Sequence, residues 1–371
     1  MSQSFAALGV SRRVAEALAE RGITTPFAVQ RLVISDVLAG DDVLVQSPTG
    51  SGKTLAFGLG LVDRLDPGAK RPGALILAPT RELAGQIVEE LDAVAAARRL
   101  SIAAVYGGVG FGPQIKRARA ADILVATPGR LEDLLQRGSL TLANVRMLVL
   151  DEADRMLDMG FRPAVDRIVA KTPRDRQTLF FSATLQGMAG KLAARYTTDA
   201  RRHVQAPKRE RRAKVEHRFV HVESQGAKLG ALVGELRDSD RGRTLVFVRT
   251  KRGADRLVKR LRVHEVSAAA MHGNKSQAQR EKVLARFGRG EVETLIATDV
   301  AARGIDVDDI THVINFDAPG DRDAYLHRVG RTGRAGRPGA GVSFVLADQT
   351  KDMRRIATDL GLGREFDASR R

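Results

Sequence analysis

The stretch VLVQSPTGSGKTLAFGLGLV, residues 43 to 62, decides the fold class of this chain. It reads as a short buried strand from Val43, then a glycine-rich turn, then an apolar helix. The turn, Ser47 to Thr54, has the order of a phosphate-binding loop, in which backbone N–H groups and a helix N-terminus hold phosphate oxygens. A strand, such a loop and a helix in this order indicate an α/β domain that binds a nucleotide.

The residues of this loop have separable expected roles. Gly50 and Gly52 let the backbone turn tightly and point N–H groups at phosphate oxygens. Lys53 is expected to reach the β- and γ-phosphates, and the Thr54 hydroxyl to ligate Mg²⁺. Ser47 stands where the strict pattern begins with glycine, and a small residue still fits there. A plain glycine-rich turn is the alternative, which the flanking strand and helix disfavour. The nucleotide contacts expected from the loop are Thr49, Gly50, Ser51, Gly52, Lys53 and Thr54.

The run MLVLDEAD, from Met147, supplies an acidic pair for the same site. A buried strand here ends in carboxylates at its C-terminal tip, where α/β sheets place ligands. Asp151 is expected to hold Mg²⁺ through water, and Glu152 to position and deprotonate the attacking water. An exposed acidic turn at the start of a helix is the alternative. Together with the phosphate loop, the pair predicts hydrolysis of ATP.

Short apolar runs recur along the first half of the chain, each followed by a loop and a helical pattern. Most are continuous rather than alternating, as in strands buried on both faces of a parallel sheet. Amphipathic stretches such as RELAGQIVEELDAVAAA, from Arg81, lie between them. The alternation predicts βαβ units. The expected strands begin at Val43, Ala74, Ile102, Ile123, Met147 and Thr178.

A basic stretch interrupts this rhythm and divides the chain. Residues 199–214 hold seven Lys or Arg against two acids, which predicts an exposed linker over 201–214. Both a solvated charge run and direct contact with nucleic acid explain the charge. A first domain over 1–200 and a second α/β domain over 215–371 are therefore expected. The strands of the second domain are expected to begin at His217, Thr244, Val266, Thr294, His312 and Gly341.

Composition narrows the class of partner. The 371 residues carry a formal net charge of +17, which favours a polyanion: nucleic acid, a ribosomal surface or an anionic membrane. Without Trp and with three Tyr, stacking platforms for bases are scarce, so sequence-independent phosphate and sugar contacts are expected. The lack of cysteine excludes disulfides and Cys-based zinc sites. No apolar run suits a signal core or a membrane span, and a cytoplasmic location is the default expectation.

From Asp151 the chain reads DEAD, and around this tetrapeptide it resembles the DEAD-box RNA helicases, a two-lobed family. The match extends over nearly the whole chain, in order and with sensible spacing. The resemblance implies two tandem RecA-like domains, each a mainly parallel β-sheet flanked by helices. It also implies ATP and Mg²⁺ as cofactors and RNA, single-stranded or a short duplex, as partner.

In the first lobe, residues 22–30, GITTPFAVQ, resemble the Q motif of the family. This implies adenine recognition by Gln30 with Phe5 nearby, although residues 27–29 replace the usual Thr-Pro-Ile. The segments PTRELA (79–84), Gly107–Gly108 and TPGR (127–130) resemble elements that hold the RNA backbone. Ser182 and Thr184, in SAT, resemble the motif that links hydrolysis to strand separation. The implied RNA contacts of this lobe are Pro79, Arg81, Gly108, Thr127 and Arg130.

In the second lobe, LVFVRT (245–250) and HGNKSQAQR (272–280) resemble further RNA-contacting elements. ATDVAARGID (297–306) resembles a motif that touches RNA and, through Gly304 and Asp306, the nucleotide. HRVGRTGR (327–334) resembles the arginine-finger motif, which implies γ-phosphate contacts by Arg331 and Arg334. The implied RNA contacts of this lobe are Arg249, Thr250, Gln277, Arg280 and Thr298.

The function expected from these motifs is ATP-dependent remodelling of short RNA duplexes or RNA–protein complexes. Taken singly, the arginine-rich turn also fits a solvated loop, PTRELA a helix cap and TPGR a plain turn. These alternatives do not explain why all three motifs occur together in this order. A DNA helicase of the same superfamily, a non-enzymatic RNA scaffold and a membrane-surface ATPase are the alternatives. Ribosomal or RNA-decay partners are compatible but not identifiable. The expected catalytic residues are Lys53, Asp151, Glu152, Arg331 and Arg334.

Overall fold

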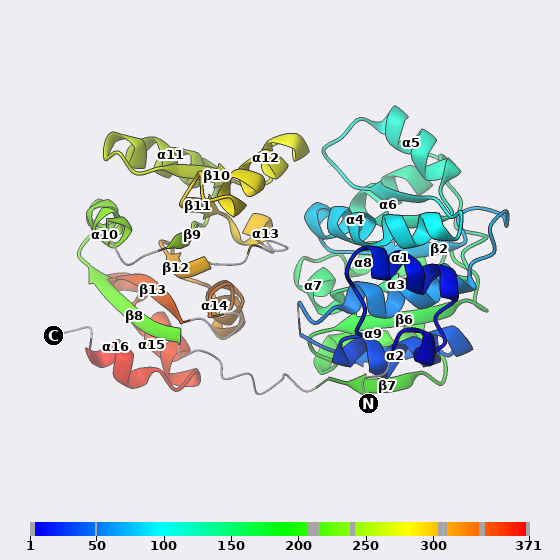
Figure 1. Ribbon diagram of the computed structural model, residues 1–371. Helices are drawn as coiled ribbons and strands as arrows, with labels where there is room; N and C mark the ends of the chain where they lie inside the picture. Colours follow the sequence, from blue (N-terminus) through cyan, green and yellow to red (C-terminus); the bar gives the residue numbers. More distant parts are fainter. Residues whose placement is uncertain are drawn as a thin grey trace. The chain divides into compact units, whose positions relative to one another are not determined.

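The computed structural model describes residues 4–48, 50–205, 215–237, 242–302, 307, 310–333 and 338–368. The chain divides into two compact units, Met1–Lys208 and Arg209–Arg371. Each unit is a parallel sheet with helices on both of its faces (Figure 1). This confirms the predicted fold class in both halves. None of the helices within the described ranges is long and apolar enough to cross a bilayer.

The first unit contains a seven-stranded sheet in the order β3-β4-β2-β5-β6-β1-β7, with every pairing parallel. The predicted strand starts are confirmed within one residue. The strands are β1 (Val43–Gln46), β2 (Ala74–Leu77), β3 (Ile102–Val105), β4 (Ile123–Ala126), β5 (Met147–Leu150), β6 (Gln177–Ser182) and β7 (Arg201–Val204). The helices are η1 (Ala6–Leu8), α1 (Arg12–Glu20), α2 (Ala28–Ala39), α3 (Lys53–Arg64), α4 (Arg81–Ala97), α5 (Phe111–Ala120), α6 (Pro128–Gln136), α7 (Ala153–Asp158), α8 (Arg162–Val169) and α9 (Gly187–Tyr196).

The strands of this sheet are apolar without alternation because both of their faces are buried. Ile76 of β2 belongs to one core cluster, with residues of α1 to α4. Its neighbour Leu75 belongs to the other cluster, with residues of α6, α8 and α9. Continuous runs such as ALIL and MLVL are the sequence signature of strands that are covered in this way.

The predicted linker needs a correction at its start. Arg201–Val204 forms β7, which pairs with β1, and Gln205 N continues the ladder by donating to Gln46 O at 2.9 Å. The segment is charged because β7 is an edge strand that is largely exposed. Arg201 pairs with Asp41, just before β1, and His203 lies beside Asp36 of α2. The sheet therefore includes residues 201–204, and residues 206–214 of the linker lie outside the described part of the chain.

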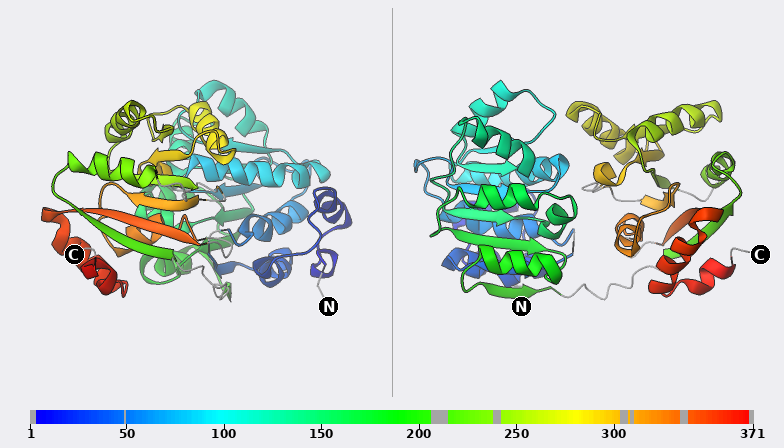
Figure 2. Two further views of the ribbon diagram at one scale, coloured as in Figure 1. Left: turned by 60° about the vertical axis from the view of Figure 1, so that its left-hand side comes forward. Right: turned by 180° about the vertical axis from the view of Figure 1, so that it is seen from behind.

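The second unit contains a six-stranded parallel sheet in the order β10-β11-β9-β12-β13-β8, and Figure 2 shows its helices on both faces. The strands are β8 (Val215–Val222), β9 (Arg243–Phe247), β10 (Ala268–Met271), β11 (Thr294–Ala297), β12 (Ile310–Asn315) and β13 (Gly339–Leu346). The helices are α10 (Ala227–Leu236), α11 (Lys251–Val263), α12 (Gln277–Gly288), α13 (Asp299–Ala302), α14 (Arg322–Val329), η2 (Ala347–Gln349), α15 (Thr350–Asp359) and α16 (Gly363–Ala368).

Candidate active site and nucleic-acid interface

The phosphate loop joins β1 to α3, and its shape depends on Gly52. This residue precedes α3 with a φ of 86°, a backbone conformation that favours glycine. A Cβ atom there would lie 2.5 Å from Phe27 Cδ2 and 2.8 Å from Gln30 Nε2, so a side chain does not fit. The buried Lys53 starts α3 and donates from Nζ to Ser47 O at 3.3 Å. The loop thus has the backbone form and the buried cation expected of a phosphate site.

The departure at Ser47 has a structural reason. Its hydroxyl donates to Gln205 Oε1 at 2.6 Å and lies 2.6 Å from Ser51 Oγ. Ser47 N also donates to Ser182 O at 3.0 Å. The backbone link to β6 is open to any residue, but glycine has no hydroxyl with which to bind Gln205, the residue that follows β7.

The acidic pair follows β5 beside this loop. Asp151 is buried, and burial raises its pKa to about 6, an effect that the Lys53 ammonium opposes and the Glu152 carboxylate reinforces. Glu152 is also buried and forms an ion pair with the buried Arg155. Its φ of 49° lies in the left-handed region, where a residue with a side chain is strained, as often happens at functional sites. Both carboxylates are held in fixed positions at the C-terminal end of β5.

The raised pKa of Asp151 predicts a trade-off between activity and stability. The pKa of Asp151 is 3.8 in an open chain and about 6 in the folded protein. Ionisation of this carboxyl therefore lowers the free energy of unfolding, and the loss reaches its full size above about pH 6. Asp151→Asn is expected to stabilise the nucleotide-free first unit at pH 8 by up to about 3 kcal/mol. The gain should shrink toward zero as the pH falls to about 4. Urea unfolding at several pH values measures it, with the exposed Asp175→Asn as control. An equal gain at every pH would contradict the prediction.

Asp154, the last residue of DEAD, connects this pair to the predicted coupling motif. Its Oδ2 atom accepts hydrogen bonds from Ala183 N at 3.0 Å and Thr184 N at 3.2 Å. Ser182 is fully buried, and its hydroxyl donates to Thr184 O. Ser182 therefore ends β6, and Thr184 lies on the following loop, which the DEAD segment holds through one carboxylate.

The Q-motif glutamine lies against the phosphate loop. Gln30 is buried, accepts from Phe27 N at 2.7 Å through Oε1 and donates to Gly52 O at 3.0 Å through Nε2. Phe5 is only 3% exposed and packs with Leu8 and other core residues, so its contact with a nucleotide stays a prediction. Phe27 is instead 61% exposed beside Gly52. The substitution of the usual Thr thus places an open aromatic ring at the loop.

The predicted RNA residues of the first unit lie in the other half of the same sheet. The segments expected to bind nucleotide follow β1, β5 and β6, which are adjacent in the sheet. The predicted RNA segments follow β2, β3 and β4, which are adjacent to one another on the other side of β5. Because all strands are parallel, all these segments leave the carboxyl edge. Three helices, α4, α5 and α6, begin there, and helix N-termini favour anions.

Three of the predicted RNA residues lie close together at this edge. A Cβ on Gly108, whose φ is 87°, would lie 2.1 Å from Arg81 Nη1, so glycine is required for the guanidinium to pack there. Arg130 donates to Val109 O at 3.0 Å and lies over the Phe111 ring at 4.2 Å. Burial is the main cause that lowers the Arg130 pKa, and the charge of Arg81 adds to it. The nearby Asp133 carboxylate opposes this fall, and the two guanidinium groups thus lie near each other, as an anion site requires.

The remaining predicted residues of this edge, Pro79 and Thr127, lie at the starts of two helices. Pro79 is buried and precedes Thr80, whose hydroxyl accepts from Leu83 N at 3.2 Å and caps α4. Thr127 is buried at the start of α6, and its hydroxyl makes no cap bond to that helix. The capping interpretation of PTRELA is therefore correct for Thr80, and it is compatible with an anion at the same helix end.

The second unit presents its predicted RNA residues after β9, β10 and β11, which are also neighbours. Arg249 and Thr250 are exposed, and the Thr250 hydroxyl caps α11 by accepting from Gly253 N at 2.9 Å. Thr298 is buried, and its carbonyl accepts from Ala301 N and Ala302 N in α13. Arg280 is buried on α12. The structure thus brings these four residues to one edge of the second sheet.

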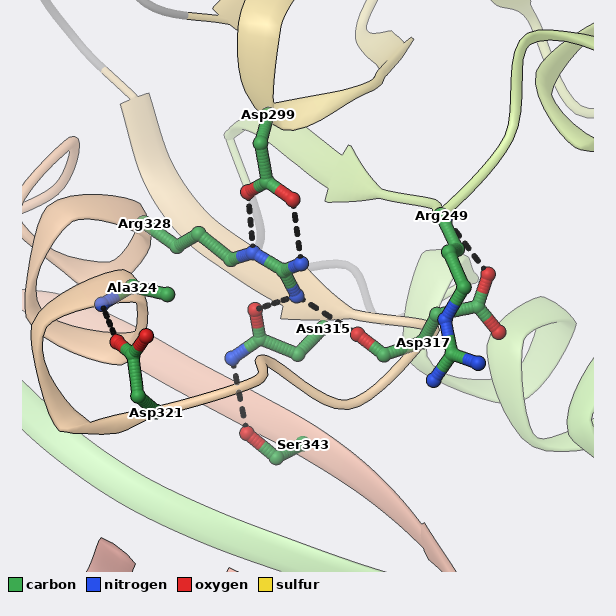
Figure 3. A network of polar contacts seen from close by, with 8 residues as sticks. All are labelled: Arg249, Asp299, Asn315, Asp317, Asp321, Ala324, Arg328 and Ser343. Carbon is green, nitrogen blue, oxygen red and sulfur yellow. Dashed lines mark hydrogen bonds and ion pairs between the residues drawn. The ribbon is translucent and has the colours of Figure 1, made fainter. Parts of the chain in front are cut away.

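A network around Arg328 holds the arginine motif of the second unit (Figure 3). The guanidinium of Arg328 is 4% exposed and binds both carboxylate oxygens of Asp299, at 2.6 and 2.7 Å. It also donates to Asn315 Oδ1 at 3.1 Å and Asp317 O at 2.7 Å. Asp317 Oδ2 in turn accepts from Arg249 N at 2.8 Å. One side chain therefore connects the segments after β9, β11 and β12.

Arg331 follows this network directly. It is buried, and its backbone N–H donates to Arg328 O at 3.1 Å. Thr332 next to it donates from its hydroxyl to Ile310 O at 2.6 Å. The backbone that carries Arg331 is thus fixed from both sides. Four other predicted site residues lie outside the described part of the chain, as does the side chain of Gln277; the four are Thr49, Gly304, Asp306 and Arg334.

Sequence reasoning did not find Phe27, Asp154, Gln205 and Arg328. Asp154 and Arg328 stood inside quoted motifs, and a role for them depends on which distant backbone they contact. Gln205 fell in the predicted linker. Phe27 carried a usable signal, because an aromatic residue at a position that usually caps a helix has no capping function there.

Comparison with known proteins agrees with this arrangement. The family model for the DEAD/DEAH box helicase domain matches residues 27–191, and that for the helicase conserved C-terminal domain matches residues 227–336. RNA helicase CrhR of Synechocystis is 42% identical over 90% of this chain and 68% of its own length. The DEAD-box ATP-dependent RNA helicase CshA of Bacillus subtilis is 37% identical over 96% of this chain and 72% of its own length.

Solved structures give the same result. Dbp5 of S. cerevisiae, bound to RNA and ADP BeF3, matches 97% of this chain and 94% of its own, with a TM-score of 0.84 and 28% identity. A DEAD box protein of Methanococcus jannaschii is 38% identical, with a TM-score of 0.54 over 97% of both chains. With both family models, these relatives and the two sheets in agreement, this chain belongs to the DEAD-box family of ATP-dependent RNA helicases.

Proposed function

We propose that the chain holds one RNA strand by its backbone on both units, separates short duplexes locally, and releases the strand when ATP is hydrolysed. The observation that carries this proposal is the division of the first sheet. The carboxyl edge of this sheet bears the phosphate loop after β1, the acidic pair after β5 and the SAT motif at the end of β6. The same edge bears the predicted RNA segments after β2, β3 and β4. Both ligands would thus bind groups fixed by the same sheet.

On the nucleotide side, Lys53 would neutralise the β- and γ-phosphates, and Gln30 would recognise the adenine. Mg²⁺ would be held by Thr54 and, through water, by Asp151. The donor set fits this ion, because Mg²⁺ binds few carboxylates and otherwise keeps water and phosphate oxygens. No cluster of three or more His, Cys, Asp or Glu residues suited to a metal occurs in the described ranges. Mg²⁺ would stabilise the charge that develops on the phosphates, and Glu152 would take the proton of the attacking water.

On the RNA side, the strand would lie on helix N-termini and guanidinium groups. Arg81, Gly108 and Arg130 in the first unit and Arg249, with Thr250, in the second offer donors to phosphates without reading bases. The basic charge of +17 and the scarcity of aromatic residues support this mode. Binding of this kind would be largely indifferent to sequence.

Coupling between the two ligands would pass through short, fixed connections. Asp154 holds the Ser182–Thr184 loop beside the acidic pair, so a change at the γ-phosphate would reach that loop directly. Arg331 would contact the γ-phosphate only in a closed state of the two units. ATP and RNA would both favour that state, and each would therefore increase the affinity for the other.

The test is the rate of ATP hydrolysis with and without nucleic acid. We expect single-stranded RNA to raise the rate at least tenfold, and DNA of the same sequence to raise it much less, because only RNA offers the 2′-hydroxyl. Lys53→Ala should abolish both rates. Equal stimulation by DNA would indicate the DNA helicase alternative. A rate that ignores both polymers would contradict the coupling, and RNA binding that persists in Lys53→Ala without any ATPase in the parent chain would indicate a scaffold.

The proposed function is compatible with several cellular pathways. Ribosome assembly, RNA decay and adaptation to cold all fit the same site chemistry. A cytoplasmic location stays a prediction from the sequence. A membrane-surface ATPase is the weakest alternative, since the predicted ligand groups converge on nucleotide and RNA rather than on an amphipathic surface.

A further inference from the structure

The residues proposed to hold the RNA strand, Arg81, Gly108, Arg130, Arg249 and Thr250, form what we call the strand site. Helix α11 carries an exposed ridge of cations that the strand site does not use. Its inner face is apolar and packs into one core cluster of the second unit through Ala254, Leu257 and Leu261. Figure 2 shows the helix at the periphery of that unit. Five exposed cations cover its outer side, and we call them the basic ridge. They are Arg252, Arg256, Lys259, Arg260 and Arg262.

The ridge has no counter-charges of its own. The acid on this helix, Asp255, is occupied by Lys275 Nζ at 2.9 Å and His272 Nε2 at 3.0 Å. Within the described residues, no acid forms an ion pair with any member of the ridge. On α15, in contrast, Arg354 pairs with Asp367 and Arg355 with Asp352.

This arrangement disfavours the helix unless an anion is present. Arg252 and Arg256, and again Arg256 and Arg260, are like charges four residues apart, which destabilise a helix. Arg252, Arg256 and Lys259 lie above one another on one stripe, and the eleven residues from 252 to 262 span about 15 Å. A rod of cations of this length matches a polyanion rather than a single small anion.

The position of the ridge indicates which polyanion. Thr250, one of the proposed strand contacts, caps the start of this helix, so RNA that reaches this residue can continue along α11. The exposed side of α11 carries no aromatic residue. The strand site already accounts for single-stranded RNA, and a straight row of cations on a rigid helix fits the regular phosphate backbone of double-stranded RNA, which is recognised through phosphates and shape. We propose that the basic ridge binds the phosphate backbone of a double-stranded RNA arm next to the single strand that the strand site holds. This inference rests on the proposed strand site.

Two labelled RNAs test the proposal in the full chain. One is a ten-nucleotide single strand, and the other is the same strand followed by a stable hairpin. Binding is measured by fluorescence anisotropy with a non-hydrolysable ATP analogue, at 50 to 200 mM salt. The variants are Arg256→Glu/Lys259→Glu and the milder Arg256→Gln/Lys259→Gln, which keeps a good helix former at each position. The matched control reverses two exposed charges on α15, Lys351→Glu/Arg355→Glu.

We expect the parent chain to bind the hairpin RNA more tightly than the single strand. In Arg256→Glu/Lys259→Glu this advantage should fall about tenfold or more, while affinity for the single strand stays within about twofold of the control. Loss of two phosphate contacts should lower the slope of log K against log salt by about 1.4–1.8 for the hairpin RNA. The Gln variant should show a smaller change in the same direction.

Other outcomes would overturn the proposal. Unchanged hairpin affinity and slope in both variants would make the ridge a solvated surface. If those variants instead lost affinity for polyglutamate, the ridge would suit an acidic protein. Equal loss with both RNAs would assign these residues to the strand site. In each case, the increase in ATP hydrolysis caused by the single strand reports separately on the proposed function, because the variants leave the ATP site and the strand site unchanged.

Discussion

Glu152→Gln is expected to lower the RNA-stimulated ATPase rate by about 10²- to 10⁴-fold, the usual contribution of a general base. ATP binding should persist, because Gln removes a charge and a proton acceptor but keeps the size of the side chain. The hydrolysis step would then be blocked with both ligands bound. RNA affinity in the presence of ATP should therefore equal or exceed that of the parent chain, and RNA should dissociate more slowly.

The structure gives this prediction a specific risk. Glu152 is buried in an ion pair with Arg155, so Gln leaves a buried guanidinium without its anion. The Gln oxygen can still accept a hydrogen bond from Arg155. A thermal melt of the variant checks the fold, and Glu16→Gln on the exposed face of α1 is the matched control. ATPase close to the parent rate would remove Glu152 from the role of base, and loss of ATP-dependent RNA binding in a folded variant would contradict the trapped state.

The sequence predicted what depends on local order. The phosphate loop, the strand that ends at Asp151 and helix α4 each follow from a continuous pattern within about 20 residues. The predicted stretch from Arg81 matches the observed bounds of α4, Arg81–Ala97. Strand order did not follow from the sequence, and it is the order that separates the nucleotide half of the first sheet from the RNA half.

Features that depend on distant partners were not predicted. The segment RRHV looked like linker because its charges are typical of exposed chain, and only pairing with β1, more than 150 residues earlier, makes it a strand. Ser47 looked like a tolerated substitution until Gln205 supplied an acceptor for its hydroxyl. In the same way, Arg328 looked like one more basic residue of a motif, whereas its hydrogen bonds reach the ends of two strands, β11 and β12.

Arg331→Ala is expected to have the second large effect, a fall of about 10³- to 10⁵-fold in the RNA-stimulated ATPase rate. An arginine delivered to the transferring phosphoryl group stabilises charge that develops in the transition state, and alanine offers nothing in its place. Arg331→Lys should recover little of the rate, because a lysine ammonium lacks the planar fork of donors. RNA binding without nucleotide should change little, since the phosphate contacts are proposed on other residues.

Arg328 provides the comparison that separates catalysis from folding. Arg328→Ala would remove the buried guanidinium that binds Asp299, Asn315 and Asp317, and it should lower the melting temperature of the second unit. Arg331→Ala should lose its activity with a much smaller change in melting temperature, and the exposed Arg354→Ala should alter neither. Equal destabilisation by Arg331→Ala and Arg328→Ala would make Arg331 a structural residue. If the folded Arg331→Ala variant hydrolysed ATP at nearly the rate of the parent chain, groups of the first unit alone would stabilise the transition state.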